Sequence, residues 1–132
     1  MSSQRMSLTL LPEAMAICRL DAGASIPAWA IAADWWSVTR TQDELSIVCA
    51  EARVPAGVAT SRGWRALQFD GPLPLDQTGI LASVTAPLAV ARVSVFVVAT
   101  FNTDYLLIPA AQRVAAIDAL ERAGHSVHSQ GY

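Results

Sequence analysis

The fold of this 132-residue chain is decided by residues 64–128, which read WRALQFDGPLPLDQTGILASVTAPLAVARVSVFVVATFNTDYLLIPAAQRVAAIDALERAGHSVH. The pattern predicts, in order, a strand, a Gly/Pro-rich turn, a helix, a strand, a tight loop, a strand, a helix and a strand, over residues 64–69, 71–79, 80–91, 93–98, 101–104, 105–108, 110–123 and 125–128. This βαββαβ order predicts an α+β unit with two helices on one face of a four-stranded antiparallel sheet. Such a unit buries a core without closing a catalytic cleft, so we expect function at loop ends or open edges.

Both predicted helices carry end signals. The Thr78 hydroxyl can cap the first helix, and four apolar residues then share one face: Ile80, Val84, Leu88 and Ala91. Pro87 removes one backbone donor inside that helix, which predicts a kink near Ser83. The second helix has Pro109 just before or at its first position and Gly124 just after its end, with a buried stripe of Val114, Ile117 and Leu120.

The amino-terminal half reads as short strands over residues 6–11, 14–20, 35–39 and 45–50, with Pro12-Glu13 separating the first two and one short helix over 28–33. Residues 54–63 combine Pro, two Gly and small side chains, and they form the best boundary. We therefore expect two halves, residues 1–62 and 63–132. Neither half is large enough to form a stable core alone. A sheet shared by the two halves would explain why so little of the chain is linker.

The apolar content of 53% and the mean hydropathy of +0.37 require a test for membrane segments. Residues 80–101 are long enough to span a bilayer. However, Pro87 and Arg92 lie near the middle of this segment, and a central charge costs roughly 3 kcal/mol on insertion into a bilayer. The second half of the segment is rich in β-branched residues, which is typical of a buried strand. We expect no membrane helix, and a partner subunit that covers the excess apolar surface.

The charge and the cysteine content of the chain argue against further classes of protein. The net charge is −2 and all nine basic residues are Arg, which leaves no basic stripe for nucleic acid. Met1–Met6 has one Arg and no apolar core of a secretory signal, so a cytosolic protein is expected. Cys18 and Cys49 each lie in an apolar run, which favours reduced, buried thiols over a disulfide.

Three polar segments are candidate sites. At Asp76–Ile80 a helix start offers unpaired N–H groups to a carboxylate and Gly79 permits close approach, although Thr78 could simply cap the helix and Gly79 relieve crowding. Thr100–Asp104 is an ordinary turn sequence, but in this topology it lies at the same sheet end as that helix start, where Asp104 could bind a cation. Thr39–Ser46 is either a solvated hairpin turn or a contact for a ligand or the other half.

Signals for catalysis or metal binding are weak. His125 and His128 lie three apart on a predicted strand and point to opposite faces, which disfavours a shared metal. Asp70, Asp76 and Asp104 could gather at one sheet end without a partner base or metal cluster, and no nucleophile or phosphate-loop motif is present. The four tryptophans are interpreted as core or interface anchors rather than stacking platforms: Trp29, Trp35, Trp36 and Trp64. We expect no enzyme, cofactor or metal.

Several segments, taken in order, resemble a family of small bacterial ACT-domain proteins with two tandem ACT-like halves. They are Trp36–Thr41, Glu44–Cys49, Gly63–Leu67, Gly71–Leu73, Thr78–Leu81, Pro87–Ala89 and Thr100–Tyr105. The pattern is also similar to the regulatory ACT domains of aspartate kinases and to cytosolic arginine sensors. The resemblance implies a ferredoxin-like fold, with residues 1–62 as a degenerate ACT-like half and residues 63–132 as an ACT domain.

The resemblance also implies a binding site for a free amino acid. Its carboxylate would lie at the helix start and its cation at the loop acid, on seven residues: Thr78, Gly79, Ile80, Thr100, Phe101, Thr103 and Asp104. The chain departs from the family pattern at Ala99, Asn102 and Pro74–Leu75, which removes a carboxylate and a hydroxyl and argues against a strongly basic ligand. We expect a cytosolic, homodimeric amino-acid sensor without catalysis; the alternative is a protein-interaction or dimerisation module that has lost the pocket.

Overall fold

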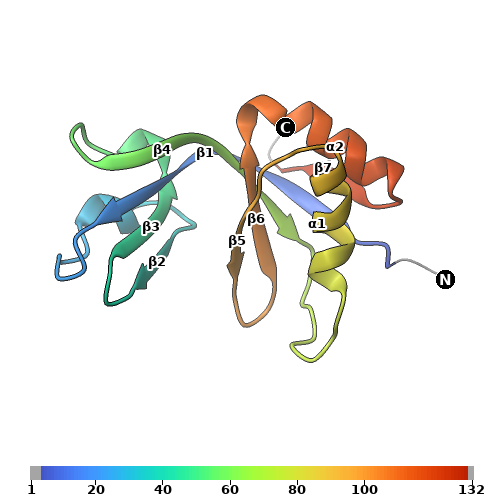
Figure 1. Ribbon diagram of the computed structural model, residues 1–132, viewed down its shortest axis with the longest axis horizontal. Coiled ribbons are helices and arrows are strands. Elements are labelled where there is room, and N and C mark those ends of the chain that lie inside the picture. Colours follow the sequence, from blue (N-terminus) through green and yellow to red (C-terminus); the bar gives the residue numbers. More distant parts are fainter. Residues whose placement is uncertain (1–3, 131–132) are drawn as a thin grey trace. The chain divides into compact units, whose positions relative to one another are not determined.

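The computed structural model describes residues 4–130 (Figure 1), in which seven strands, two α-helices and three short 3₁₀ helices occur. In chain order these are β1 (Ser7–Leu20), η1 (Ala28–Ile31), β2 (Ser37–Arg40), β3 (Leu45–Ala50), η2 (Glu51–Arg53), β4 (Ala59–Phe69), α1 (Ile80–Val90), β5 (Phe96–Ala99), β6 (Asp104–Pro109), η3 (Ala110–Gln112), α2 (Arg113–Arg122) and β7 (Ser126–Ser129). Residues 1–3 and 131–132, at the outer ends of the two expected halves and partly within the Met1–Met6 segment, lie outside the described residues.

The chain forms two compact units. Unit 2 is Glu13–Trp64, and unit 1 comprises the described residues up to Pro12 and those from Arg65 onward. The division between Trp64 and Arg65 lies close to the expected boundary at residue 62. The residues of β1 up to Pro12, however, belong to unit 1 together with the carboxy-terminal residues. The expected break at Pro12-Glu13 does not interrupt β1. Pro12 lies between residues 7–10, which pair with β7, and residues 15–20, which pair with β3, so its missing N–H falls outside both registers.

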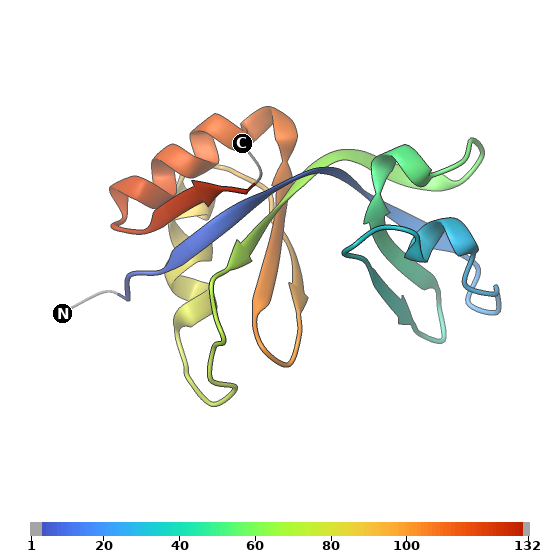
Figure 2. The same cartoon turned by 180° about the vertical axis from the view of Figure 1, so that it is seen from behind.

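From β4 onward the elements follow the predicted order, β4-α1-β5-β6-α2-β7. The expected four-stranded antiparallel sheet needs a correction, however. The strand order in unit 1 is β7-β1-β4-β6-β5, with β5 and β6 antiparallel and β1 parallel to β7 (Figure 2). The amino-terminal strand is thus inserted between β4 and β7, a long-range pairing that local periodicity does not report.

The core of unit 1 lies between this sheet and both helices. Alternate residues of three strands point to it, and the buried members are Leu8, Leu10, Leu67, Phe69, Leu106 and Ile108. From α1 come Ile80, Val84 and Leu88, and from α2 come Ala116 and Leu120. Because both helices contribute to one cluster with one face of the strands, they cover the same face of the sheet, as predicted (Figure 1).

Two residues assigned to buried stripes lie at the surface. Val114 is 73% exposed and Ala91 is also exposed. Helix α2 begins only at Arg113, after the 3₁₀ turn η3, and its buried face runs through Ala116 and Leu120 instead. Helix α1 ends at Val90, so Ala91 follows the last turn.

Helix α1 contains Pro87, and the carbonyl that this proline leaves without an intrahelical donor is that of Ser83. The buried His125 side chain occupies that position: its Nε2–H donates to the Ser83 carbonyl at 2.8 Å, while its Nδ1 accepts the Met6 N–H at 2.9 Å. This pattern requires the neutral Nε2–H tautomer. His125 therefore replaces a helical hydrogen bond and ties the start of β1 to α1.

Unit 2 has its own core, built from β1, β3, η1 and the segment after β3. Its strand order is β2-β3-β1-β4, and β1 and β2 both pair antiparallel with β3. Trp29 packs against this core. Cys18 and Cys49 are buried within it as free thiols, which confirms the predicted reduced state.

The segment tested as a membrane span forms an 11-residue helix followed by a short strand. Among residues 4–130, no helix has both the length and the hydropathy needed to cross a bilayer.

Candidate functional site

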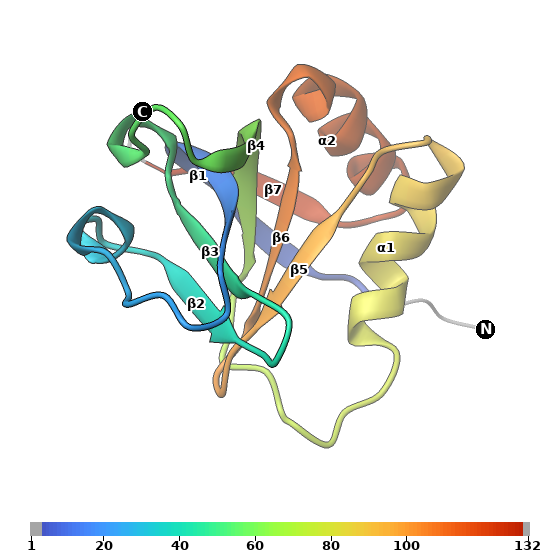
Figure 3. The ribbon, with the colours of Figure 1, turned by 60° about the vertical axis from the view of Figure 1, so that its left-hand side comes forward.

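A cavity of about 480 Å³ lies in unit 1, beside the start of α1. The loop before α1 and the loop between β5 and β6 both lie at the same end of the unit 1 sheet, as predicted (Figure 3). Of the seven predicted site residues, six line this cavity: Gly79, Ile80, Thr100, Phe101, Thr103 and Asp104. Thr78 is not part of the lining, although its neighbour Gly79 is.

The start of α1 is not capped as predicted. Gly79, not Thr78, is the N-cap residue, and no side chain within residues 4–130 caps the helix. The first intrahelical hydrogen bond runs from Ser83 N–H to the Gly79 carbonyl at 3.0 Å. The amides of Ile80, Leu81 and Ala82 therefore precede the helical ladder, and all three residues line the cavity.

Backbone conformation explains the glycine at this position. Gly79 has φ +82°, a left-handed conformation that residues with a Cβ rarely adopt. A Cβ built there would lie 4.0 Å from its nearest neighbour, Gln4 Oε1, so crowding is not the reason for glycine. The glycine cap therefore offers no side chain of its own to bond to the helix amides at the cavity wall.

The β5–β6 loop is held by its own threonines. Thr100 Oγ1 donates to the Thr103 carbonyl at 2.8 Å and accepts the Thr103 N–H at 3.2 Å. The Thr103 side chain is buried, and its Oγ1 donates to the Phe69 carbonyl at 2.7 Å. Next to it, the Leu73 N–H donates to the Asn102 carbonyl at 2.7 Å. The two loop hydroxyls predicted for ligand binding, those of Thr100 and Thr103, are thus used to fix one cavity wall.

Replacing Thr103 with valine should destabilise unit 1 by about 1–3 kcal/mol, because the isosteric side chain leaves the buried Phe69 carbonyl without its donor. Urea unfolding followed by the circular dichroism of the helices measures this loss. The matched control is Thr85→Val, since Thr85 lines the same cavity but has no hydrogen bond of its hydroxyl in the described structure. Equal stability of the two variants would contradict a structural role for the Thr103 hydroxyl.

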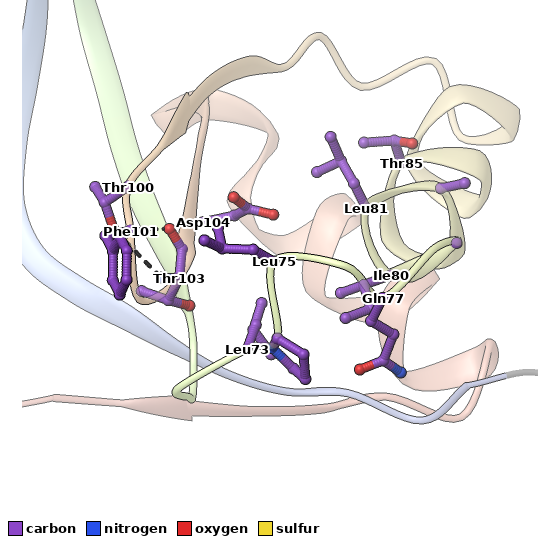
Figure 4. Close-up of a pocket in the computed structure, with 13 residues that line it drawn as sticks. Leu73, Leu75, Gln77, Ile80, Leu81, Thr85, Thr100, Phe101, Thr103 and Asp104 are labelled. Carbon is purple, nitrogen blue, oxygen red and sulfur yellow. Dashed lines mark hydrogen bonds between the residues drawn. The ribbon is translucent and has the colours of Figure 1, made fainter.

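Asp104 supplies the ionisable side chain of the cavity lining. Within residues 4–130 no side-chain hydrogen bond or ion pair engages its carboxylate. In the view of Figure 4 this carboxylate points from the loop toward helix α1, whereas the Gln77 amide points away from it. The cavity therefore combines a free carboxylate on one wall with unpaired helix amides on the other.

Most of the remaining lining is apolar, and sequence reasoning missed it. The residues are Leu73, Pro74, Leu75, Leu81 and Ala82, with Gln77 and Thr85 as additional polar members. The Gly/Pro-rich turn over residues 71–79 could have indicated these residues, because a turn that leads into the helix of a binding site also forms one side of the cavity. No periodicity marks such loop residues as cavity walls.

The third predicted segment, Thr39–Ser46, is a hairpin turn between β2 and β3. Thr41 Oγ1 accepts the N–H groups of Asp43 and Glu44, each at 3.1 Å. Arg40 donates to the carbonyls of Ala22 and Ala24, and so anchors the loop after β1. These contacts account for Arg40 and Thr41 without a ligand.

A second polar cluster lies on the other face of the unit 1 sheet. Asp70 accepts the hydroxyls of Ser7 at 2.5 Å and Thr9 at 2.6 Å, and His128 Nε2 lies 2.7 Å from Ser7 Oγ. Because the Ser7 proton is directed to Asp70, His128 donates to Ser7 Oγ and cannot act as its base. In the part of the chain that is described, no three His, Cys, Asp or Glu side chains are placed to hold a metal.

Comparison with known proteins agrees with this architecture. Residues 59–122 match the family model of the ACT domain, and residues 13–57 match a second model, described as an N-terminal domain. The solved structure of protein Atu0741 from Agobacterium tumefaciens is 41% identical, with a TM-score of 0.93, over 98% of this chain and 97% of that one. The regulatory subunit of aspartate kinase from Thermus flavus shares the fold, with a TM-score of 0.60 at 13% identity, over 93% of this chain and 99% of that one.

Among curated proteins, the rat protein "Cytosolic arginine sensor for mTORC1 subunit 1" is 37% identical over 68 residues, which are 51% of this chain. The match spans only 20% of the length of that relative. The ACT model covers α1, the β5–β6 loop and all of α2, and so includes the helix start and the loop of the candidate site. Residues 59–122 of this chain therefore form an ACT domain.

Proposed function

We propose that this protein is a non-catalytic regulatory module that binds a free amino acid in the cavity beside α1. The observation that carries the proposal is the pairing of two unsatisfied partners in one cavity, the Asp104 carboxylate and the amides of Ile80, Leu81 and Ala82. An α-ammonium group complements the first and an α-carboxylate complements the second, since a helix start favours anions. The cavity volume of about 480 Å³ lies within the usual range for small-molecule sites.

The relatives support the same class of function. The name of the rat relative describes a cytosolic arginine sensor, and the Thermus flavus structure is a regulatory subunit of a kinase. We therefore propose a cytosolic location and control of a partner, or of self-assembly, by ligand binding. His128 lies beside Asp70 but donates to Ser7 Oγ, and among the described residues no three His, Cys, Asp or Glu side chains could hold a metal, so the proposal includes no reaction at the site.

We also propose that unit 2 is a degenerate ACT-like half of a tandem. Its elements follow the order strand, η1, β2, β3, η2, strand, which is the order of β4-α1-β5-β6-α2-β7 with 3₁₀ turns in place of helices. Its strand order β2-β3-β1-β4 also corresponds to β5-β6-β4-β7, once the inserted β1 is left out of unit 1. This correspondence is the support for a ferredoxin-like arrangement repeated in both units.

A homodimer is proposed as the functional assembly. Strand β5 is an edge of the unit 1 sheet, and its Val97 is 38% exposed. An unpaired edge with apolar side chains favours pairing with another chain. Sedimentation velocity with and without ligand tests whether assembly responds to binding.

A thermal-shift panel of the twenty amino acids tests the binding proposal. A ligand at about 100 times its dissociation constant should stabilise the protein by about 2.7 kcal/mol, which raises the melting temperature by several degrees. A flat panel, combined with a stable dimer, would instead favour a dimerisation module that has lost its ligand.

Asp104→Asn should abolish this ligand-dependent shift, because it removes the partner of the ammonium group while leaving the fold intact. Asp76→Asn is the matched control, since Asp76 is an exposed acid of the adjacent loop outside the cavity lining. Isothermal titration of both variants with the amino acid found in the panel measures the loss. Undiminished binding by Asp104→Asn would overturn the assigned role of this carboxylate.

A further inference from the structure

The lining of the cavity beside α1 also bears on which amino acid it accepts. We propose that the site selects a neutral α-amino acid with an apolar side chain of about the size of leucine, and that it rejects basic amino acids. This inference rests on the proposed function, because it names the class of ligand for the same cavity.

The charge balance of the cavity is the first argument. Asp104 is the ionisable side chain among the thirteen lining residues, all of which are described. Once the α-ammonium group pairs with this carboxylate and the α-carboxylate pairs with the helix amides, the charges of the lining are used. A guanidinium or ammonium group on the ligand side chain would then be desolvated without an ionised partner, which is costly.

Hydrogen-bonding capacity is the second argument. The hydroxyls of Thr100 and Thr103 already bond to the Thr103 and Phe69 carbonyls and hold the loop in place. The Gln77 amide points away from Asp104 in Figure 4. Few polar groups therefore remain to accept the several N–H donors of an arginine side chain.

The apolar surface of the cavity is the third argument. The walls include Leu73, Leu75, Leu81 and Phe101. Leu75 is 70% exposed and Phe101 is 79% exposed, so both rank among the most exposed large apolar side chains of residues 4–130. An apolar ligand side chain between them removes this surface from water, with a gain that grows with each buried methylene group.

Isothermal titration of the full chain with leucine, methionine, alanine, arginine and lysine tests the inference. Leucine or methionine should bind at least about tenfold more tightly than alanine, since each methylene in an apolar pocket is worth about tenfold or more. Arginine and lysine should bind at least about tenfold more weakly than leucine. Leucinamide and N-acetylleucine, which lack one pole of the zwitterion, should bind more weakly than leucine.

A specificity variant sharpens the test. Leu75→Glu places a carboxylate on an exposed wall of the cavity, and it should shift the preference between arginine and leucine toward arginine by about tenfold or more. The matched control is Val114→Glu, because Val114 is similarly exposed at 73% but lies on α2 outside the cavity. Circular dichroism checks that both variants are folded, and comparison with Val114→Glu separates a local effect from added net charge.

The outcomes separate the two levels of the proposal. Arginine binding as tightly as leucine would overturn the ligand class and leave an amino-acid site in place. An unchanged preference in a folded Leu75→Glu variant would overturn the assignment of this wall to the ligand side chain. Absence of binding by every amino acid would overturn the proposed function itself, and the ligand class with it.

Discussion

Replacing His125 with leucine should destabilise unit 1 by several kcal/mol. The buried His125 ring serves both the Met6 N–H and the Ser83 carbonyl, and leucine can serve neither. A buried polar group left without its partner costs about 1–3 kcal/mol, so two such groups account for the size of the effect. Unfolding in urea, followed by the circular dichroism of α1 and α2, measures the loss, because both α-helices of the described chain belong to unit 1.

Pro87→Ala provides the decisive comparison. Alanine restores an N–H four residues after Ser83, so the Ser83 carbonyl regains a helical partner. Alanine also favours a helix more than proline does, and Pro87→Ala should therefore stabilise either background. The gain should be larger by about 1 kcal/mol in the His125→Leu background, where the carbonyl is otherwise unpaired. If the effects of the two mutations on the free energy of unfolding were strictly additive, the His125 side chain would not be replacing the missing helical hydrogen bond.

The second large effect is a loss of stability at alkaline pH that Cys49 controls. Burial raises the pKa of the Cys49 thiol from 9.0 to about 12, with a further increase from the adjacent Cys18 and a partial offset from Arg62. The folded protein keeps the proton up to higher pH than the unfolded chain. Stability from the neutral thiol is therefore complete below about pH 9 and is lost as the pH rises to about 12.

Over this window the free energy of unfolding of unit 2 should fall by up to about 1.4 kcal/mol per pH unit. Tryptophan fluorescence reports this unit, since all four tryptophans lie within Glu13–Trp64. Cys49→Val fills nearly the same volume without a titrating group, and it should flatten the pH dependence. A slope that is unchanged in Cys49→Val would show that other groups cause the alkaline loss.

Much of the secondary structure could be predicted because its causes are local. The apolar spacing of Ile80, Val84 and Leu88 places a helix face regardless of what packs against it, and Gly124, at φ +99°, ends α2 as expected. The turn sequence Thr100–Asp104 likewise forms through its own side chains.

The wrong predictions had both local and long-range causes. Thr78 has the correct chemistry for a cap, but the chain enters α1 through a left-handed Gly79 and the Thr78 hydroxyl is not used. Val114 fits a helical stripe, but the start of α2 at Arg113 puts it in solvent. The pairing of β1 with β7 joins residues more than a hundred positions apart, which no local pattern reveals.

For the candidate site, the two polar ends could be predicted without a structure, because a helix start and an acidic loop at one end of a βαββαβ sheet follow from element order. The groups that remain free for a ligand could be identified only from the folded arrangement. The hydroxyls of Thr100 and Thr103 bond within the protein, while the Asp104 carboxylate and the first amides of α1 do not. A polar group can bind a ligand only when the fold has not already satisfied its hydrogen-bonding capacity, and this depends on neighbours brought together from distant parts of the chain.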